Sequence, residues 1–231
     1  MKRHLYALVL SLLAFVGCSE RAVGYDSIEE LFASGKIRLE YCIFYTTNDG
    51  NKINSNSSVN ANIISHTIEE NRGRIIYDRP ITYIGGSMFA SCHNLTSITI
   101  PDSVTEIGES AFYNCTSLIS VNIPNSVTKI EAMAFARCAS LKRITIPDSV
   151  TLIDEGAFSG CTNLLNIYCQ NQQPFAIIYD QGFDASGEYY EDYSFPFNSD
   201  MKIYVPQASV NAYKTAKNWS NYASVIVGYD F

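Results

Sequence analysis

The first residues whose spacing suggests chemistry are four cysteines at intervals of 23 residues: Cys92, Cys115, Cys138 and Cys161. Zinc sites take cysteines in pairs a few residues apart, and an interval of this length provides no such pair. If successive intervals stack in space, neighbouring cysteines come within about 5 Å between α-carbons, which is the range of a disulfide. Each cysteine also lies three residues after a phenylalanine, where a small buried side chain fits. We therefore interpret the four as structural thiols, with a disulfide between neighbours as the alternative.

A second candidate is an acidic, tyrosine-rich segment at residues 180–195. Its carboxylates are Asp180, Asp184, Glu188, Glu191 and Asp192, and its central tyrosines are Tyr189, Tyr190 and Tyr193. Oxygen donors can hold Ca²⁺, but their spacing is not that of an EF-hand loop, so we assign no metal and no other cofactor. Because loops on rigid scaffolds often bind partners, we predict that the three tyrosines contact a protein or a glycan. The alternatives are that the tyrosines pack against the fold beside them and that the carboxylates are simply solvated.

Catalysis finds little support in the sequence. Apart from His4 in the amino-terminal segment, the only histidines are His66 and His93, and His93 occupies a variable position expected at the surface. No nucleophile-elbow, phosphate-loop or zinc-protease motif occurs. A glycosidase-like pair of carboxylates in residues 180–195 would need a separation fixed at about 5–9 Å, which a loop rarely supplies. We therefore predict that the protein is not an enzyme.

The elements that position these residues follow from a repeat of 23 residues, whose rows begin at residues 81, 104, 127 and 150. In the second row the recurring apolar positions are Val104, Ile107, Ala111, Phe112, Cys115, Leu118, Val121 and Ile123. One coil cannot bury so many apolar side chains alone, whereas stacked coils form one continuous core. The repeat therefore predicts a solenoid, mostly β, with a parallel sheet along one face and strands about 4.8 Å apart. Val104–Ile107 predicts a second extended side, and residues 110–112 a brief helical turn.

Alternation along the predicted strands separates an inward row from an outward face. The outward side chains form two rows, Thr99, Asn122, Thr145 and Tyr168 in one and Ser97, Ser120, Arg143 and Asn166 in the other. We predict that this face is the recognition surface, because solenoids bind partners along such rows. The alternative is an ordinary solvated sheet face. A row of threonines on the second side, Thr82, Thr105, Thr128 and Thr151, is interpreted as structural, since identical β-branched residues stabilise stacked strands.

The repeat extends in both directions and divides the chain. Residues 75–206 are predicted to form the solenoid, with six coil strands, the first near Arg74–Tyr77 and the last at Ile203–Val205, and with an insertion at 174–199. Residues 18–74 are predicted to form a linker and an amino-terminal cap, with a hairpin that turns at Asp49-Gly50. Residues 207–231 are predicted to form a helix and a strand that close the other end.

The amino terminus predicts export. Residues 1–17 combine a basic start with a short apolar stretch, as in a signal peptide. Phe15-Val16-Gly17-Cys18 resembles a lipobox, so Cys18 is the predicted lipidation site, and ordinary cleavage near Gly17 is the alternative. Ser19, in place of Asp, favours the outer membrane, with the lipid as the only link to a membrane. The formal net charge of −7 excludes nucleic acid as a partner class.

The row pattern Leu-x-x-Ile-x-Ile-Pro-x-x-Val-x-x-Ile-Gly-x-x-Ala-Phe-x-x-Cys resembles the BspA-type leucine-rich repeat family over residues 81–169, and more loosely over 37–231. The departures are Glu131 and Asp154 in place of Gly, and Cys169 in place of a strand Ile. The resemblance implies a solenoid of the leucine-rich-repeat type, an extracytoplasmic location, and adhesion at the cell surface without catalytic residues. We therefore expect a noncatalytic surface lipoprotein that binds a protein or glycan, possible ligands being host matrix and mucin. The alternative is a structural or assembly component of the outer envelope.

Overall fold

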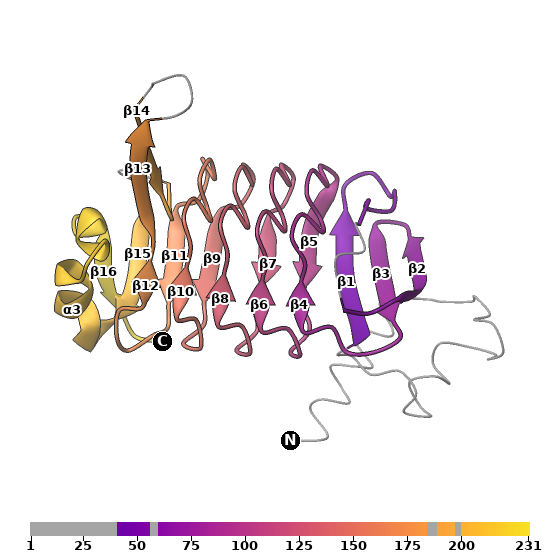
Figure 1. The fold of residues 1–231 in the computed structure, drawn as a ribbon, viewed down its shortest axis with the longest axis horizontal. Coiled ribbons are helices and arrows are strands. Elements are labelled where there is room, and N and C mark those ends of the chain that lie inside the picture. Colours follow the sequence, from indigo (N-terminus) through magenta and orange to yellow (C-terminus); the bar gives the residue numbers. More distant parts are fainter. Residues whose placement is uncertain (1–40, 56–59, 184–188, 197–199) are drawn as a thin grey trace.

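The computed structural model describes residues 41–55, 60–183, 189–196 and 200–231. These residues form an elongated stack of coils with a sheet along each of two sides (Figure 1). The signal peptide, Cys18 and the capping segment before Tyr41 lie outside the described residues.

The principal sheet is parallel, as the repeat predicted. Its strands are β5 (Leu95–Thr99), β7 (Ser120–Asn122), β9 (Arg143–Ile146), β11 (Asn166–Cys169), β15 (Lys202–Pro206) and β16 (Ile226–Tyr229). Residues paired across neighbouring repeat strands lie 23 positions apart in the sequence, as Ser97 and Ser120 do, and Arg143 and Asn166. β7 and β9 lie side by side (Figure 1) but belong to separate hydrogen-bonded sheets.

The second side is a narrower parallel sheet, also as expected. Its strands are β4 (Tyr83–Ile84), β6 (Glu106–Ile107), β8 (Lys129–Ile130), β10 (Leu152–Ile153) and β12 (Ala176–Ile177). The threonine row beside it is structural: the hydroxyl of Thr105 donates to the carbonyl of Thr82 (3.1 Å), and Thr151 does the same to Thr128 (3.1 Å). A row of serines, which the repeat pattern did not predict, forms similar bonds between coils. The hydroxyl of Ser126, for example, donates to the carbonyl of Val104 (2.6 Å).

The third side differs from the expected helical turn. Residues 109–114 form successive turns rather than a helix. Two residues of each coil adopt a positive φ, the first at Ser87, Ser110, Met133 and Gly156 and the second at Ser91, Asn114, Arg137 and Gly160. A residue in the left-handed region redirects the chain and cannot continue a right-handed helix. Between these positions, the amide of Phe112 donates to the carbonyl of Ala134 in the next coil (2.7 Å), and the other coils repeat this bond.

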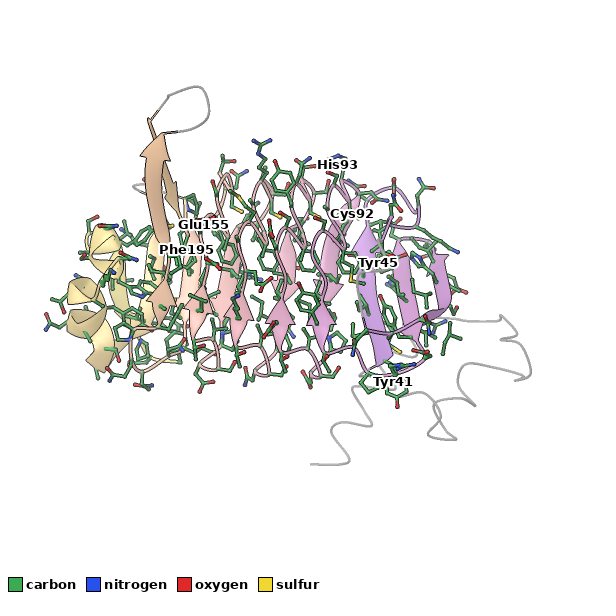
Figure 2. The ribbon with its side chains drawn as sticks, in the orientation of Figure 1. Tyr41, Tyr45, Cys92, His93, Glu155 and Phe195 are labelled. Carbon is green, nitrogen blue, oxygen red and sulfur yellow. The ribbon has the colours of Figure 1, made fainter. Side chains whose placement is uncertain are left out.

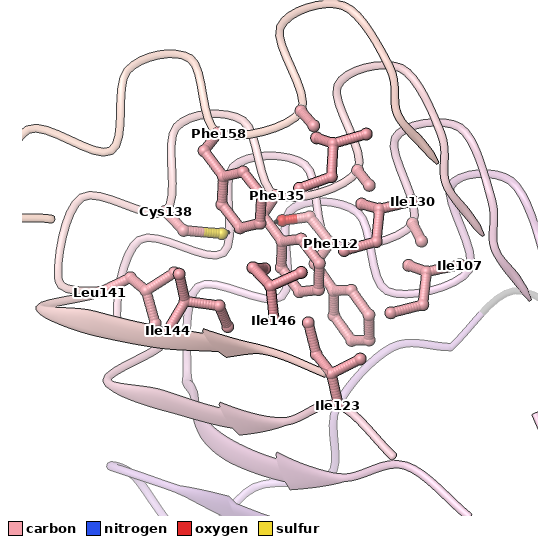
Figure 3. Packing of buried hydrophobic residues seen from close by; sticks show 14 of the residues in the cluster. Ile107, Phe112, Ile123, Ile130, Phe135, Cys138, Leu141, Ile144, Ile146 and Phe158 are labelled. Carbon is pink, nitrogen blue, oxygen red and sulfur yellow. Dashed lines mark hydrogen bonds between the residues drawn. The ribbon is translucent and has the colours of Figure 1, made fainter. Parts of the chain in front are cut away.

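The centre of the stack is a column of phenylalanine rings. Phe89, Phe112, Phe135 and Phe158 follow one another with ring centroids 5.0–5.3 Å apart and planes within 17° of parallel. Figure 3 shows the rings of Phe112, Phe135 and Phe158 among Leu141, Ile144 and Ile146. Phe195 adds a fifth ring, 5.4 Å from Phe158, although it lies 37 rather than 23 residues further along the chain.

The insertion leaves the coil as a β-hairpin. β13 (Tyr179–Phe183) and β14 (Tyr189–Tyr193) are antiparallel to each other and project from the carboxyl-terminal end of the stack (Figure 1). β12 still pairs with β10, and the amide of Ile178 donates to the carbonyl of Ile153 (3.0 Å). The coil therefore continues to Ile178, beyond the expected start of the insertion at 174.

The amino-terminal cap corrects two expectations. β1 (Cys42–Thr47), β2 (Ile63–Glu69) and β3 (Arg72–Tyr77) form an antiparallel unit in which β1 lies between β3 and β5. The predicted parallel coil strand near Arg74–Tyr77 is therefore wrong, because β3 is antiparallel to both of its neighbours. The predicted hairpin at Asp49-Gly50 is also wrong, and the hairpin instead joins β2 to β3 through Glu70 and Asn71.

The carboxyl-terminal cap agrees with expectation. It contains η2 (Gln207–Ser209), α3 (Val210–Thr215), η3 (Trp219–Tyr222) and then β16. Three buried aromatic residues bond to the last coils: Trp219 Nε1 donates to the carbonyl of Phe175 (2.7 Å), Tyr213 to that of Asn171 (3.1 Å) and Tyr222 to that of Phe195 (3.1 Å). The cap thus covers the end of the phenylalanine column.

Replacing Phe135 by alanine removes the middle ring of the column. We expect the free energy of unfolding to fall by about 3–5 kcal/mol, because the coils on both sides lose a partner. Ile119→Ala is the control, since Ile119 is 52% exposed and its truncation should change stability by less than about 0.5 kcal/mol. Urea denaturation of both variants measures the difference, and equal losses would contradict the column as the main source of stability.

Equivalent left-handed positions in the first and last rows provide a second test. Ser91 has a φ of 59° and Gly160 a φ of 70°. We expect Ser91→Gly to raise the free energy of unfolding by about 0.5–1 kcal/mol and Gly160→Ala to lower it by about 1 kcal/mol or more, because a β-carbon is disfavoured at positive φ. A β-carbon at position 160 would also meet Arg137 Cγ at 3.2 Å. Thermal denaturation should show shifts of opposite sign, and shifts of the same sign would contradict the interpretation.

Candidate recognition surface

The outward face of the principal sheet contains the two predicted rows of side chains, because successive side chains along each strand point alternately outward and into the core. Thr99 is paired with Asn122 and Ser97 with Ser120, and further along Thr145 is paired with Tyr168 and Arg143 with Asn166. The alternating residues Ile98, Ile144 and Ile167 point into the core and are buried. The structure therefore brings the predicted strand residues onto one continuous face, over β5, β7, β9 and β11.

At its amino-terminal end this face is partly closed. β1 lies beside β5, and Thr46 Oγ1 is hydrogen-bonded to the hydroxyl of Ser97 (2.7 Å) and to that of Thr96 (2.6 Å). Ser97 is half-buried, and Arg74 on β3 is buried. Ser97 is thus engaged within the fold, whereas Thr99, Ser120 and Asn122 are exposed.

A shallow hollow lies beyond the end of β7. Its volume is about 330 Å³, and its lining is Asp102, Asn122, Ile123, Pro124, Asn125 and Ser126. The hollow is open and contains no aromatic ring, so it offers small polar contacts next to the face rather than a pocket that encloses a ligand.

At its carboxyl-terminal end the face becomes aromatic. Tyr168 and Tyr204 stack with centroids 4.6 Å apart, and Tyr229 lies edge-on to both, at 5.5 and 5.6 Å. Phe231 contacts Tyr229 in turn at 5.1 Å. Tyr229 and Phe231 are 44% and 55% exposed, so this aromatic cluster of Tyr168, Tyr204, Tyr229 and Phe231 is open to solvent.

Only Tyr168 of this cluster was predicted as a site residue. The sequence could also have indicated Tyr204, because Ile203-Tyr204-Val205-Pro206 repeats the strand pattern and so places Tyr204 in the row of Tyr168. No sequence pattern indicated Tyr229 and Phe231, because the carboxyl-terminal segment lies outside the repeat. Their place in the cluster depends on β16 pairing in parallel with β15.

The tyrosines of the insertion lie on β14 and do not join the sheet face in the structure. Tyr189 is paired with Phe183, Tyr190 with Gly182 and Tyr193 with Tyr179 along the hairpin. Among the described strands, β13 and β14 pair only with each other. The two predicted contact regions are therefore separate elements at the same end of the molecule (Figure 1).

The repeat cysteines are buried free thiols that take part in coil-to-coil hydrogen bonding. Cys115 Sγ donates to the carbonyl of Phe89 (3.1 Å), Cys138 to that of Phe112 (3.2 Å) and Cys161 to that of Phe135 (3.0 Å). Burial raises the pKa of Cys92 to about 12, and hydrogen bonding to Cys115 and Cys161 raises that of Cys138 strongly. A neutral, inaccessible thiol is neither a nucleophile nor a metal ligand, which agrees with the structural interpretation.

His66 and His93, the histidines among the described residues, have structural or surface positions. Tyr45 and His66 are hydrogen-bonded through Oη and Nε2 (2.7 Å), and burial lowers the pKa of His66. His93 lies at the rim of the turns (Figure 2), exposed and 3.4 Å from Thr116 Oγ1. Within the described ranges, no three histidine, cysteine or acidic residues come together as a metal site would require.

A solenoid with a parallel sheet on one side and turns opposite defines a leucine-rich-repeat fold. Residues 82–188 match the model of the BspA type leucine rich repeat region, in six copies. Residues 82–188 are therefore a leucine-rich repeat region of the BspA type, which occurs in bacterial surface proteins generally engaged in protein interaction or adhesion. Its repeat fold is typically noncatalytic. None of the curated proteins matches the chain.

Solved structures of leucine-rich repeat proteins are similar in part. A T. pallidum leucine-rich repeat protein is 24% identical over 64% of this chain and 63% of its own, with a TM-score of 0.45. A leucine rich cell surface protein from Faecalibacterium prausnitzii is 28% identical over 51% and 37%, with a TM-score of 0.37. A leucine-rich repeat protein from Bacteroides capillosus is 35% identical over 41% and 60%, with a TM-score of 0.31. The chain thus spans less than two thirds of each of these proteins.

In the part of the chain that the structure describes, no helix has the length and apolar character needed to cross a bilayer.

Burial of the thiols leads to a test with a thiol reagent. In the chain carrying Cys18→Ser, we expect Ellman's reagent at pH 8 to leave Cys42, Cys92, Cys115, Cys138, Cys161 and Cys169 unmodified while the protein is folded, and to modify all six after unfolding. Four modified thiols in the unfolded, unreduced protein would instead indicate a disulfide.

Folding raises the pKa of Cys92 from 9.0 to about 12, because burial disfavours its thiolate. The contribution of the neutral Cys92 thiol to the free energy of unfolding should therefore be full below about pH 9 and lost as the pH rises toward 12.

Proposed function

We propose that this protein is a noncatalytic recognition or adhesion protein of the bacterial cell surface, which binds a protein or glycan through the outward face of its principal sheet and through the tyrosine-rich hairpin. The observation that carries the proposal is the contrast between the two ends of the face. Toward β1 the outward Ser97 is hydrogen-bonded to Thr46 within the fold, and toward β16 the aromatic cluster exposes Tyr229 and Phe231. Open aromatic residues on a rigid sheet are typical of contact surfaces.

The proposal includes the anchor. Residues 1–17 serve as a signal peptide, and Cys18 carries the lipid that retains the protein at the outer membrane. The solenoid then stands on a linker, which leaves its sheet face accessible from outside the cell. Metabolic labelling with a palmitate analogue should mark the wild-type chain and not Cys18→Ser, and equal labelling would contradict lipidation at Cys18.

Binding by the face is tested with matched variants. We expect Arg143→Ala/Tyr168→Ala to weaken binding to a matrix protein or mucin that captures the wild-type chain by at least about tenfold, because exposed Arg and Tyr residues dominate contact energies. Lys214→Ala, an exposed change on α3, should bind like the wild type. Biolayer interferometry measures the affinities, and unchanged binding by the double variant would contradict the face as the binding surface.

Protease shaving of intact cells separates this function from a structural role in the envelope. A surface recognition protein should be cleaved by added protease without lysis. Complete resistance, together with the absence of any captured ligand, would contradict surface recognition and favour the assembly component.

A further inference from the structure

The aromatic cluster of Tyr168, Tyr204, Tyr229 and Phe231 adjoins a row of polar and basic side chains on the same face. In register, Arg143 pairs with Asn166 and Asn166 with Lys202, while two residues further along each strand Tyr168 pairs with Tyr204. Strands about 4.8 Å apart with a rise of about 3.3 Å per residue place the basic row about 7 Å from the aromatic row, and Arg143 about 10 Å from Lys202. The basic row and the row of Tyr168 and Tyr204 are therefore separated by about the width of one sugar ring. Tyr229 is in register with Pro206 and lies two residues further along, so a ligand that contacts both Tyr229 and the basic row must span more than one sugar.

The charge on this face is opposite to that of the whole chain. The chain carries 23 acidic and 16 basic side chains, yet the outward positions of β5, β7, β9, β11 and β15 hold Arg143 and Lys202 and no Asp or Glu. The nearest carboxylates in sequence lie outside the strands: Asp102 follows β5, Asp148 follows β9, Asp200 precedes β15 and Asp230 follows β16. A partner that carries negative charge is therefore repelled by most of the surface and attracted to this face.

The cluster is shaped to support a ring rather than to enclose one. Tyr229 lies at 71° to the planes of both Tyr168 and Tyr204, and Phe231 lies against Tyr229 at 73°. The outermost rings, Tyr229 and Phe231, are also the most exposed of the four. The exposed rings of Tyr229 and Phe231 offer open apolar surface, on which the C–H face of a sugar can pack while its hydroxyl groups stay free at the rim.

Polar partners for such hydroxyls lie beside the rings. Thr145 is exposed and Asn166 half-buried, and they adjoin Tyr168 across and along the strands. An amide side chain both donates and accepts hydrogen bonds, as vicinal hydroxyls do. An extended peptide would gain less here, because the backbone groups of β11 and β15 already pair with neighbouring strands and only side chains are presented.

We propose that the carboxyl-terminal end of the sheet face binds an anionic glycan. The sugar rings pack on Tyr229 and the rings beside it, and the carboxylate or sulfate groups are bound by Arg143 and Lys202. This inference rests on the proposed recognition function and names the class of ligand and the residues that select it. It adds Lys202, Tyr204, Tyr229 and Phe231 to the predicted contact residues.

The test uses the full chain, with its amino-terminal processing, against heparin and hyaluronan as anionic polysaccharides, dextran as a neutral one and poly-L-glutamate as an acidic polypeptide. We expect saturable binding to heparin or hyaluronan and not to dextran, with affinity that falls at least tenfold as NaCl rises from about 50 to 500 mM, because ion pairs are screened. Tyr229→Ala and Arg143→Gln/Lys202→Gln should each weaken binding at least tenfold. Tyr229→Phe, which keeps the ring, and Lys214→Gln, which removes an exposed cation elsewhere, should bind like the wild type.

Three outcomes would overturn the inference. Binding to neither anionic polysaccharide would do so, as would equal loss of binding in Lys214→Gln, which would mean attraction to any cation on the surface. Preference for poly-L-glutamate over both polysaccharides would assign an acidic protein partner instead. The proposed function would survive each of these results if a matrix protein or mucin still bound the face, so the two proposals fail separately.

Discussion

The structure depends on one constraint: each coil can bury its apolar side chains only against the next coil. Up to Phe158, the phenylalanine column, the thiol bonds and the threonine and serine bonds join residues 22–26 positions apart, which is one coil to its neighbour. Backbone hydrogen bonds set the spacing between coils, and the ring spacing of 5.0–5.4 Å follows closely. Because every coil repeats the same contacts, a local change in one coil affects both of its neighbours.

This constraint explains how the insertion is accommodated. The extra residues between Ile178 and Ser194 cannot enter the core without breaking the column, so they leave it as the β13–β14 hairpin. Phe195 then returns to the column, and the amide of Phe158 donates to the carbonyl of Ser194 (2.9 Å) as Phe135 does to Ala157 (2.8 Å). The insertion thus changes the outline of the molecule and leaves its packing unchanged, which is how a solenoid can acquire a new surface element.

The ends of the stack decide where a partner can approach the sheet face. The antiparallel unit of β1, β2 and β3 continues the sheet at the amino-terminal end and ties Ser97 to Thr46. At the other end the cap packs Trp219, Tyr213 and Tyr222 inward, while β16 adds Tyr229 to the outward face. The same carboxyl-terminal segment therefore both closes the core and extends the aromatic cluster on the outward face.

The sequence by itself determined the coil. A period of 23 residues fixes which side chains face inward, so the parallel strands, the second sheet, the structural cysteines and the outward row from Thr99 to Tyr168 were all predictable. Only the tertiary structure decided what happens where the period fails. Alternation at Ile75 and Tyr77 fits a strand of either direction, and no local pattern shows that β1 lies between β3 and β5. Tyr229 likewise joins Tyr168 through two strand pairings that link segments far apart in the chain, and a pairing of that kind leaves no signal in the sequence around either residue.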